Sequence, residues 1–268
     1  MQKFLFCLST ICFSAQLLSA LPEYTSAADT NEYRDVCKEA VRDENAFAHF
    51  KRLHEYTRIL EHLGTDTGIP YLKIIKQQTP EFIAAIERFK VNDRIGDPRT
   101  DVYPEIGTIS TTTLRYMKVA SDLKVLFQSL NGKSIVEIGG GYGGQCLILS
   151  LVNRFKSYTI VDLPEPLELT RKYLERHHVS NVTYKTFDEA ITDGSFDLVI
   201  SNYAYSECVP EMRKKYVEEI LSRSKRGYIT GNGFAEELTE YLRPYGILCE
   251  QFTETPLTCP DNVLVLWR

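Results

Sequence analysis

One stretch limits the folds open to this chain more than any other. Residues 134–138 form a mostly apolar, β-branched run that leads directly into glycines at 139–144, interrupted only by Tyr142. An amphipathic run over residues 146–155 follows. Glycine permits positive φ angles and close approach of the backbone to a ligand, although a dense glycine run weakens regular structure. The stretch therefore predicts a strand, a tight turn and a helix, which is how a nucleotide-binding βαβ unit begins.

The spacing of the glycines is compatible with two ligands. Gly139, Gly141 and Gly144 satisfy the G-x-G-x-x-G pattern of dinucleotide sites. Glu137 with Gly139, Gly141 and Gly143 satisfies E-x-G-x-G-x-G. We favour the second pattern, because a carboxylate two residues before the first glycine would repel a pyrophosphate. The first pattern keeps an NAD-dependent oxidoreductase as an alternative.

The second pattern resembles the first motif of the class I S-adenosylmethionine (SAM) methyltransferases. The resemblance implies an α/β fold with a Rossmann-like seven-stranded sheet and SAM as the cofactor. It also implies that Glu137 helps to orient the methionine end of SAM, and that the loop with Gly140 passes beneath the cofactor. The domain is expected over residues 131–268, with strands within residues 134–138, 158–161, 182–187, 196–202, 226–230, 248–253 and 262–267.

Polar residues follow three of these expected strands. Asp162 lies roughly twenty residues beyond the glycines, where a carboxylate can accept hydrogen bonds from both ribose hydroxyls. Leu163, next to it, is assigned to the same cofactor site. Asp188 follows the third strand, where it would contact the adenine or else cap a short helix. Asn202 ends the fourth strand and is the last predicted cofactor residue.

Two further segments resemble the bacterial sugar O-methyltransferases. Upstream of the glycines stand Gly-Asp-Pro at 96–98, a hydroxyl-rich turn at 108–113 and Leu-Arg-Tyr at 114–116. Downstream, Ser-Asn-Tyr-Ala-Tyr-Ser-Glu occupies residues 201–207. The resemblance implies O-methylation of a hydroxyl on a sugar or glycan precursor, in a pocket covered by a helical N-terminal part. It places Arg115, Tyr116 and Tyr203 at the acceptor, with ordinary helix or edge packing as the alternative.

The expected reaction needs help with a proton, because a sugar hydroxyl is a weak nucleophile. Glu207 is the first candidate for the general base and Tyr205 is the second. The faces of Tyr203 and Tyr205 would alternatively stabilise the sulfonium cation of SAM. We expect no metal site, since the histidines lack partners at metal-ligand spacing.

The first twenty residues differ from the rest. A basic start at Lys3 precedes a largely apolar stretch, and small residues at 19–20 and 26–28 offer cleavage sites. Residues 1–20 therefore predict a signal peptide, with cleavage possible as late as residue 28. Export conflicts with the cytosolic supply of SAM, so the compartment stays open. A non-catalytic, exported binding or effector protein of this fold is a further alternative.

Residues 30–130 are predicted to be a helical cap region, with helices over residues 32–63, 80–91 and 112–130. The formal net charge of -5 gives no reason to expect a nucleic-acid surface. The expected partner is a small-molecule or glycan acceptor, and no stable membrane span is expected after the signal is removed. The sequence does not set the oligomeric state.

Overall fold

The computed structural model describes residues 26, 28–190 and 194–268, so the predicted signal peptide lies outside the described residues. No helix within those ranges has the length and apolar character needed to cross a membrane. The α-helices are α1 (Asn31–Arg42), α2 (Glu44–His49), α3 (His54–Thr57), α4 (Thr65–Gln78), α5 (Pro80–Ala84), α6 (Ile86–Phe89), α7 (Thr111–Phe127), α8 (Gly144–Val152), α9 (Pro164–Arg176), α10 (Phe187–Ala190), α11 (Ala204–Glu207), α12 (Pro210–Glu219) and α13 (Ala235–Leu242). The strands are β1 (Asp101–Tyr103), β2 (Gly107–Ile109), β3 (Ser134–Ile138), β4 (Ser157–Val161), β5 (Val182–Lys185), β6 (Leu198–Asn202), β7 (Gly227–Asn232), β8 (Glu250–Thr253) and β9 (Asn262–Trp267).

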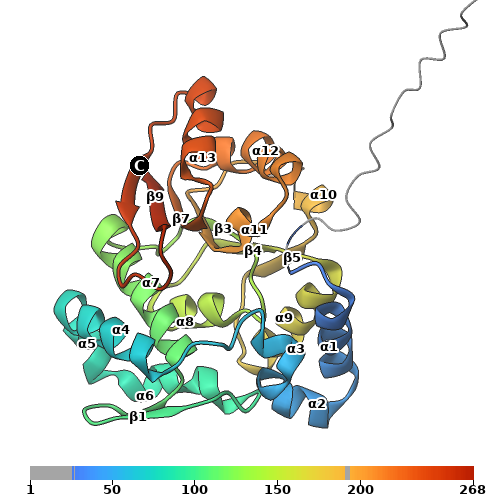
Figure 1. The fold of residues 1–268 in the computed structure, drawn as a ribbon, viewed down its shortest axis with the longest axis vertical. Coiled ribbons are helices and arrows are strands. Elements are labelled where there is room, and N and C mark those ends of the chain that lie inside the picture. The colour runs from blue at the N-terminus through green and yellow to red at the C-terminus, as the bar shows by residue number, and fades with distance from the viewer. Residues whose placement is uncertain (1–25, 27, 191–193) are drawn as a thin grey trace, which may run out of the picture.

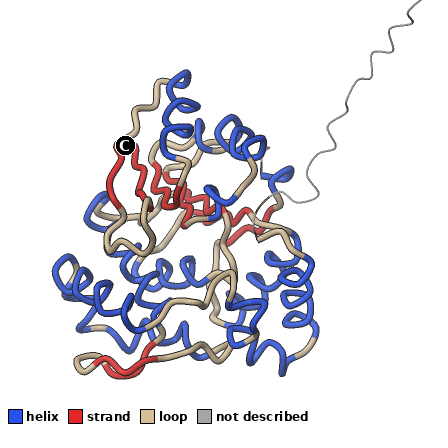
Figure 2. The backbone as a smooth tube through the Cα atoms, in the orientation of Figure 1, coloured by secondary structure: helices blue, strands red, loops and turns tan. Residues whose placement is uncertain are grey.

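Seven strands form one sheet in the order β5-β4-β3-β6-β7-β9-β8 (Figure 2). Strands β3 to β7 pair in parallel, whereas β9 is antiparallel to both of its neighbours. A parallel pair needs a crossover of a dozen or more residues, and the connection from β8 to β9 is shorter than that. The predicted Rossmann-like seven-stranded sheet is confirmed, including its C-terminal hairpin.

Helices cover both faces of the sheet (Figure 1). Side chains alternate along β3, so Ile135 packs in the cluster that includes α7, α8 and α9. Val136 and Ile138 point to the opposite face and pack with α11, α12 and α13. The N-terminal helices α1 to α6 lie outside α7 to α9 as a further layer (Figure 1). They share one continuous hydrophobic cluster with that face of the sheet.

The N-terminal part differs from the prediction in its helix boundaries. The expected helix over residues 32–63 is divided into α1, α2 and α3, because Asp43 is extended and caps α2 by accepting a hydrogen bond from the Ala46 N–H at 2.7 Å. Helix α4 begins where a break was predicted and contains Pro70. The helix expected over residues 80–91 is divided at Ala85, and the hairpin β1–β2 was not predicted.

The start of α7 is fixed by a buried polar cluster. The Ser110 hydroxyl caps the helix by accepting a hydrogen bond from the Thr113 N–H at 3.1 Å. Asp93 holds Ser110 in turn, accepting hydrogen bonds from its N–H and its hydroxyl, each at 2.7 Å. The next turn of this helix carries Arg115 and Tyr116, so the cap sets where those two side chains point.

Candidate functional site

A cavity of about 450 Å³ lies at the carboxyl ends of the central strands. Residues from the ends of five strands line it: Ile138 and Gly139 after β3, Val161 and Asp162 after β4, Asn202 and Tyr203 after β6, Asn232 of β7 and Asn262 of β9. The chain leaves β3 toward β4 and later returns on the other side as β6. Ligands of open α/β sheets bind at such a switch point, so this crevice is the expected site.

Asp162 lines this cavity, as predicted, and is oriented by the glycine loop. Its Oδ2 accepts a hydrogen bond from the Gly141 N–H at 3.1 Å, and its Oδ1 accepts one from the Leu163 N–H at 2.8 Å. Burial raises the pKa of Asp162 to about 6, partly offset by these backbone N–H groups. A carboxylate offers about four lone-pair positions, so each oxygen keeps one for a ligand. The two remaining positions suit the adjacent hydroxyls of a ribose.

The glycine loop needs glycine for two different reasons. Gly139 has φ +75°, and a Cβ there would lie 2.0 Å from the Cβ of Ala204. Gly141 has φ +56°, and a Cβ there would meet the Leu60 side chain at 2.7 Å. The loop is therefore clamped between α11 and the segment that follows α3. Both glycines line the cavity.

Tyr142, the one side chain inside the glycine run, points away from the cavity into the N-terminal part. It is fully buried and packs edge-on against Phe50 and Tyr173. The buried Lys51 ammonium lies 4.0 Å from the centre of the Tyr142 ring and donates to the Asn92 carbonyl at 2.8 Å. The loop that shapes the cavity also anchors the N-terminal helices.

Glu137 lies beneath the loop and is not among the residues that line the cavity, so its role in orienting the methionine end of SAM stays a prediction. Strand alternation directs its side chain to the α7–α8 face, where its Oε2 accepts a hydrogen bond from the Tyr158 hydroxyl at 2.7 Å. Burial, with a smaller contribution from the nearby charge of Asp162, raises the pKa of Glu137 to about 8 against the opposing effect of the Tyr158 hydrogen bond. At neutral pH this carboxyl group therefore holds its proton.

We expect the stability of the fold to fall as the pH rises from about 5 to about 8 because of Glu137. Its ordinary pKa is 4.5 and its folded value is about 8, so the folded state binds the proton more tightly across this window. Glu137→Gln removes the titration. The free energy of unfolding in urea is measured for both proteins at pH 5 and pH 8. The value for the variant minus that for wild type is expected to be larger at pH 8 than at pH 5 by more than about 1 kcal/mol.

Glu87→Gln is the matched control, because the Glu87 side chain is 80% exposed. Its difference from wild type is expected to stay within about 0.5 kcal/mol at both pH values. If the free energies of unfolding of the Glu137 variant and wild type differ by the same amount at both pH values, the raised pKa is contradicted.

The end of β6 supplies three more predicted residues to the cavity. Asn202, Tyr203 and Glu207 all line it. Surrounding protein raises the pKa of the Glu207 carboxyl group above its ordinary value, although the side chain remains accessible to solvent. The Arg115 guanidinium, which also lines the cavity, acts in the opposite direction on that pKa. The predicted acceptor residues Arg115 and Tyr203 meet here, with the guanidinium carbon 5.8 Å from the Tyr203 ring centre.

Other predicted residues lie outside the lining of the cavity. Tyr205 is fully buried between Tyr216 and Phe234, so it has no access to a reacting hydroxyl. Tyr116 packs on Tyr142, with ring centres 6.0 Å apart. Gly140 and Gly143 belong to the loop but pack against Ile160 and Leu174. Asp188 is exposed on α10.

An apolar wall beside Asp162 was not predicted. Phe187, the residue before Asp188, lines the cavity with Met212 and Tyr216, and the Phe187 and Tyr216 rings meet edge-on at 4.8 Å. Leu163, a predicted cofactor residue, also lines the cavity here. Flat aromatic bases bind well between such side chains. The strand–helix pattern predicted a cofactor contact at Asp188, one position away from Phe187. It did not indicate which of the two side chains faces the cavity.

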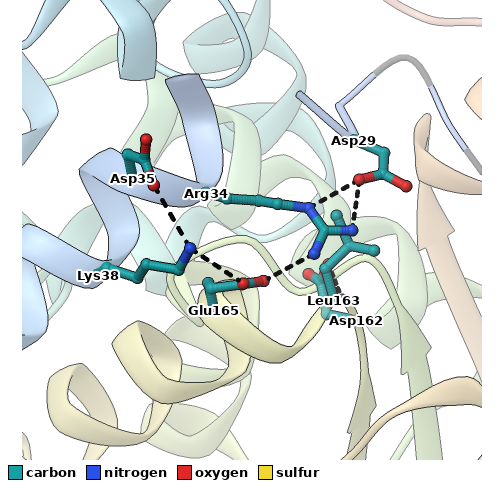
Figure 3. Close-up of polar contacts among 7 residues, drawn as sticks. All are labelled: Asp29, Arg34, Asp35, Lys38, Asp162, Leu163 and Glu165. Atoms are coloured by element: carbon teal, nitrogen blue, oxygen red, sulfur yellow. Dashed lines mark hydrogen bonds and ion pairs between the residues drawn. The ribbon is translucent and has the colours of Figure 1, made fainter. Parts of the chain in front are cut away.

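The N-terminal part also contributes residues to the cavity. The sequence predicted that a helical N-terminal part covers the pocket, but not which side chains of α1 to α3 line it. Tyr33 of α1 lines it, together with four residues after α3, namely Ile59, Leu60, His62 and Leu63. Helix α1 is held there by Arg34, which donates to Asp29 at 2.8 Å and to Glu165 at 3.2 Å (Figure 3). Glu165 lies three residues after Asp162, so these ion pairs hold α1 over the end of the crevice at which Asp162 lies. We call Asp29, Arg34 and Glu165 the ion-pair latch.

No group of three or more His, Cys, Asp or Glu side chains within the described ranges is arranged to hold a metal ion.

Residues 136–228 match the sequence profile of a family described as "Methyltransferase domain". No curated protein matches the chain. Solved structures that match include a precorrin-8w decarboxylase from Methanobacterium thermoautotrophicum (20% identity, 56% of this chain and 89% of that chain, TM-score 0.44). A TehB-like SAM-dependent methyltransferase from Corynebacterium glutamicum matches at 16% identity over 53% of this chain and 83% of its own, with TM-score 0.43. A methyltransferase from Pyrococcus furiosus matches at 18% identity over 55% and 80%, with TM-score 0.42.

The matched segment runs from β3 to β7 and contains the glycine loop, Asp162 and Glu207. Its side chains fit the nucleoside part of SAM. Asp162 offers a lone pair on each oxygen to the ribose diol, and the wall of Phe187, Met212 and Tyr216 suits the adenine. The family match indicates SAM rather than NAD as the ligand of this loop. Residues 136–228 therefore resemble a methyltransferase domain on a Rossmann-like α/β sheet, and S-adenosylmethionine is the cofactor that the match indicates.

Proposed function

We propose that this protein transfers a methyl group to a hydroxyl oxygen of a sugar or glycan precursor. SAM supplies the methyl group, which it carries on a sulfonium sulfur. The observation that carries the proposal is that Glu207 lines the same cavity as Asp162, two strands away along the sheet. A carboxylate at that place can take the proton from a hydroxyl that approaches beside the nucleoside site.

The raised pKa of Glu207 fits this role. Surrounding protein raises it, and the positive charge of Arg115 opposes the rise. A carboxylate with a raised pKa is a stronger base than one at its ordinary pKa. Its accessibility through the cavity allows a substrate hydroxyl to reach it.

The acceptor end of the cavity supports a hydroxyl-bearing substrate. Asn262 is 3% exposed and lines the cavity, and its Oδ1 has no hydrogen-bond partner among the described residues. Its amide is oriented, because the Nδ2 group donates to Glu254 at 3.0 Å and to Thr258 at 2.9 Å. An unpaired buried acceptor costs free energy unless a ligand donates to it. A sugar hydroxyl can make that hydrogen bond.

The hydrogen bonds around Asn262 make this wall rigid. Glu254 accepts hydrogen bonds from the Tyr203 hydroxyl and, at 3.1 Å, from the Thr258 N–H. Tyr203 follows β6, whereas Glu254 and Thr258 lie between β8 and β9. The network thus joins the strand that precedes Glu207 to the C-terminal hairpin and fixes the pocket before a substrate binds.

Calorimetric titration with S-adenosylhomocysteine, followed by transfer of tritium from labelled SAM to a panel of sugars and nucleotide-linked sugars, tests the proposal. Binding together with label in an acid-stable methyl ether supports it. Binding without transfer to any carbohydrate contradicts it and favours the non-catalytic binding protein. Binding of NADH in place of S-adenosylhomocysteine would favour the oxidoreductase.

Arg34→Met is expected to weaken S-adenosylhomocysteine binding about 3- to 10-fold, mainly through faster release. The Arg34 side chain is 27% exposed, so its ion pairs are only partly screened by water. Without them, α1 and Tyr33 cover the cavity less tightly. Arg52→Met, which removes a surface pair with Asp97, is the control. Equal dissociation rates for the two variants in stopped-flow measurements would show that the latch does not act on the cofactor.

A further inference from the structure

We propose that the acceptor substrate is an anion, and that Arg115 binds its carboxylate or phosphate group. This inference rests on the proposed function in one respect, namely that an acceptor occupies this end of the cavity. The anion site itself rests on the burial and the contacts of Arg115.

The Arg115 side chain is a buried cation, and burial of a cation without an opposite charge is unfavourable. It is 8% exposed and lines the cavity, and its Nε has no hydrogen-bond partner within residues 26, 28–190 and 194–268. No carboxylate of the described residues pairs with it at ion-pair distance. A buried charge without a partner is strongly destabilising, so such a group is expected to bind an opposite charge supplied by a ligand.

The guanidinium lies close to two aromatic rings. Its central carbon lies 5.4 Å from the centre of the Tyr116 ring and 5.8 Å from that of Tyr203. These contacts stabilise the cation, and a side-chain hydrogen bond joins it to Tyr116, whereas its Nε N–H has no partner among the described residues. A planar guanidinium fork is the geometry that binds carboxylate and phosphate through two parallel hydrogen bonds.

Several titratable groups interact with the charge of Arg115, and none of those described is a carboxylate at ion-pair distance. They are Glu207, Glu61, His62, Tyr71, Tyr116 and Tyr203. Glu61 is 3% exposed, and burial raises its pKa. Arg115 is also the single Lys or Arg among the described residues that line the cavity. An incoming anion therefore finds one positive partner in this pocket.

The position of Arg115 favours the acceptor over the cofactor. The nucleoside site lies at β4, where Asp162 and the apolar wall stand. Arg115 packs on Tyr203, which follows β6, two strands along the sheet and roughly 10 Å away at the usual strand spacing. It lies on the same side as Asn262, the unpaired acceptor. An acidic sugar would place its anion on Arg115 and its hydroxyl on Asn262 and Glu207.

Two measurements on the full chain test this assignment. The first compares S-adenosylhomocysteine with 5′-methylthioadenosine, which lacks the amino-acid carboxylate, on wild type and Arg115→Met. We expect the variant to bind both nucleosides within about threefold of wild type. A tenfold or greater loss confined to S-adenosylhomocysteine would overturn the proposal, because Arg115 would then bind the carboxylate of the cofactor.

The second measurement locates a simple anion. Crystals of the S-adenosylhomocysteine complex soaked in sodium bromide are expected to show an anomalous peak within hydrogen-bond distance of the Arg115 guanidinium in wild type, and none in Arg115→Met. Absence of the peak from wild type would overturn the proposal. Arg115→Lys keeps the charge and serves as a second variant if the methionine variant does not fold; it is expected to bind bromide more weakly. Since neither measurement needs methyl transfer, failure of the anion site and failure of the proposed reaction are separable.

Discussion

Replacing Asp162 with Asn is expected to weaken binding of S-adenosylhomocysteine by about 10- to 100-fold. Both carboxylate oxygens accept a backbone hydrogen bond, from Gly141 and from Leu163. The amide of Asn must turn its NH₂ group toward one of these N–H donors, so it loses that hydrogen bond as well as one to the ribose. The backbone hydrogen bond is lost in the free protein as well, so the affinity reflects mainly the hydrogen bond to the ribose, and a hydrogen bond to a charged group contributes about 1.5–3 kcal/mol. Calorimetric titration measures the change directly.

The same carboxylate gives the binding a pH dependence. The pKa of Asp162 is raised to about 6 by burial, and a diol that donates to the carboxylate stabilises the ionised form. Affinity in wild type is therefore expected to fall as the pH decreases below about 6, and this dependence should be absent from Asp162→Asn. Asp188→Asn, the same change at an exposed position, is the control and is expected to stay within twofold of wild type. Equal losses in both variants would argue that Asp162 does not bind the ribose.

Replacing Glu207 with Gln is expected to lower kcat by about 10²- to 10⁴-fold, which is the range for loss of a general base. Gln has nearly the shape of Glu but does not take up the proton of the hydroxyl. Because Glu207 lies two strands from the nucleoside site, affinity for S-adenosylhomocysteine should change by less than about twofold. Single-turnover transfer from labelled SAM to the carbohydrate identified in the panel measures the rate.

The pH profile separates a base from a residue that only shapes the pocket. The wild-type rate is expected to fall at low pH as Glu207 gains its proton, and the residual rate of the variant should lack this limb. Glu211→Gln, an exposed change on α12, is the control. A profile that keeps the same acid limb in Glu207→Gln would assign the base to another group.

The sequence by itself determined the sheet and the position of the glycine turn and Asp162 at the edge of the cavity. Short apolar runs bounded by turns are typical of buried parallel strands, and β3 begins and ends at the predicted residues. The glycine turn and Asp162 follow the ends of adjacent parallel strands, so their proximity follows from the topology alone. Asn202 and Glu207 were found for the same reason at the end of β6.

Only the tertiary structure decided which side chains face the cavity and what covers it. Glu137 and Tyr205 turn into the two hydrophobic clusters, because strand alternation and a short helix direct them there, and Phe187 turns inward in place of Asp188. The covering segment and Arg115 lie far from the glycines in sequence, and no local pattern records their contacts. Burial of a charge depends on packing from several distant segments, whereas a strand or a turn depends on its neighbours in the chain. Local order was therefore predictable here, and the chemistry of the acceptor pocket was not.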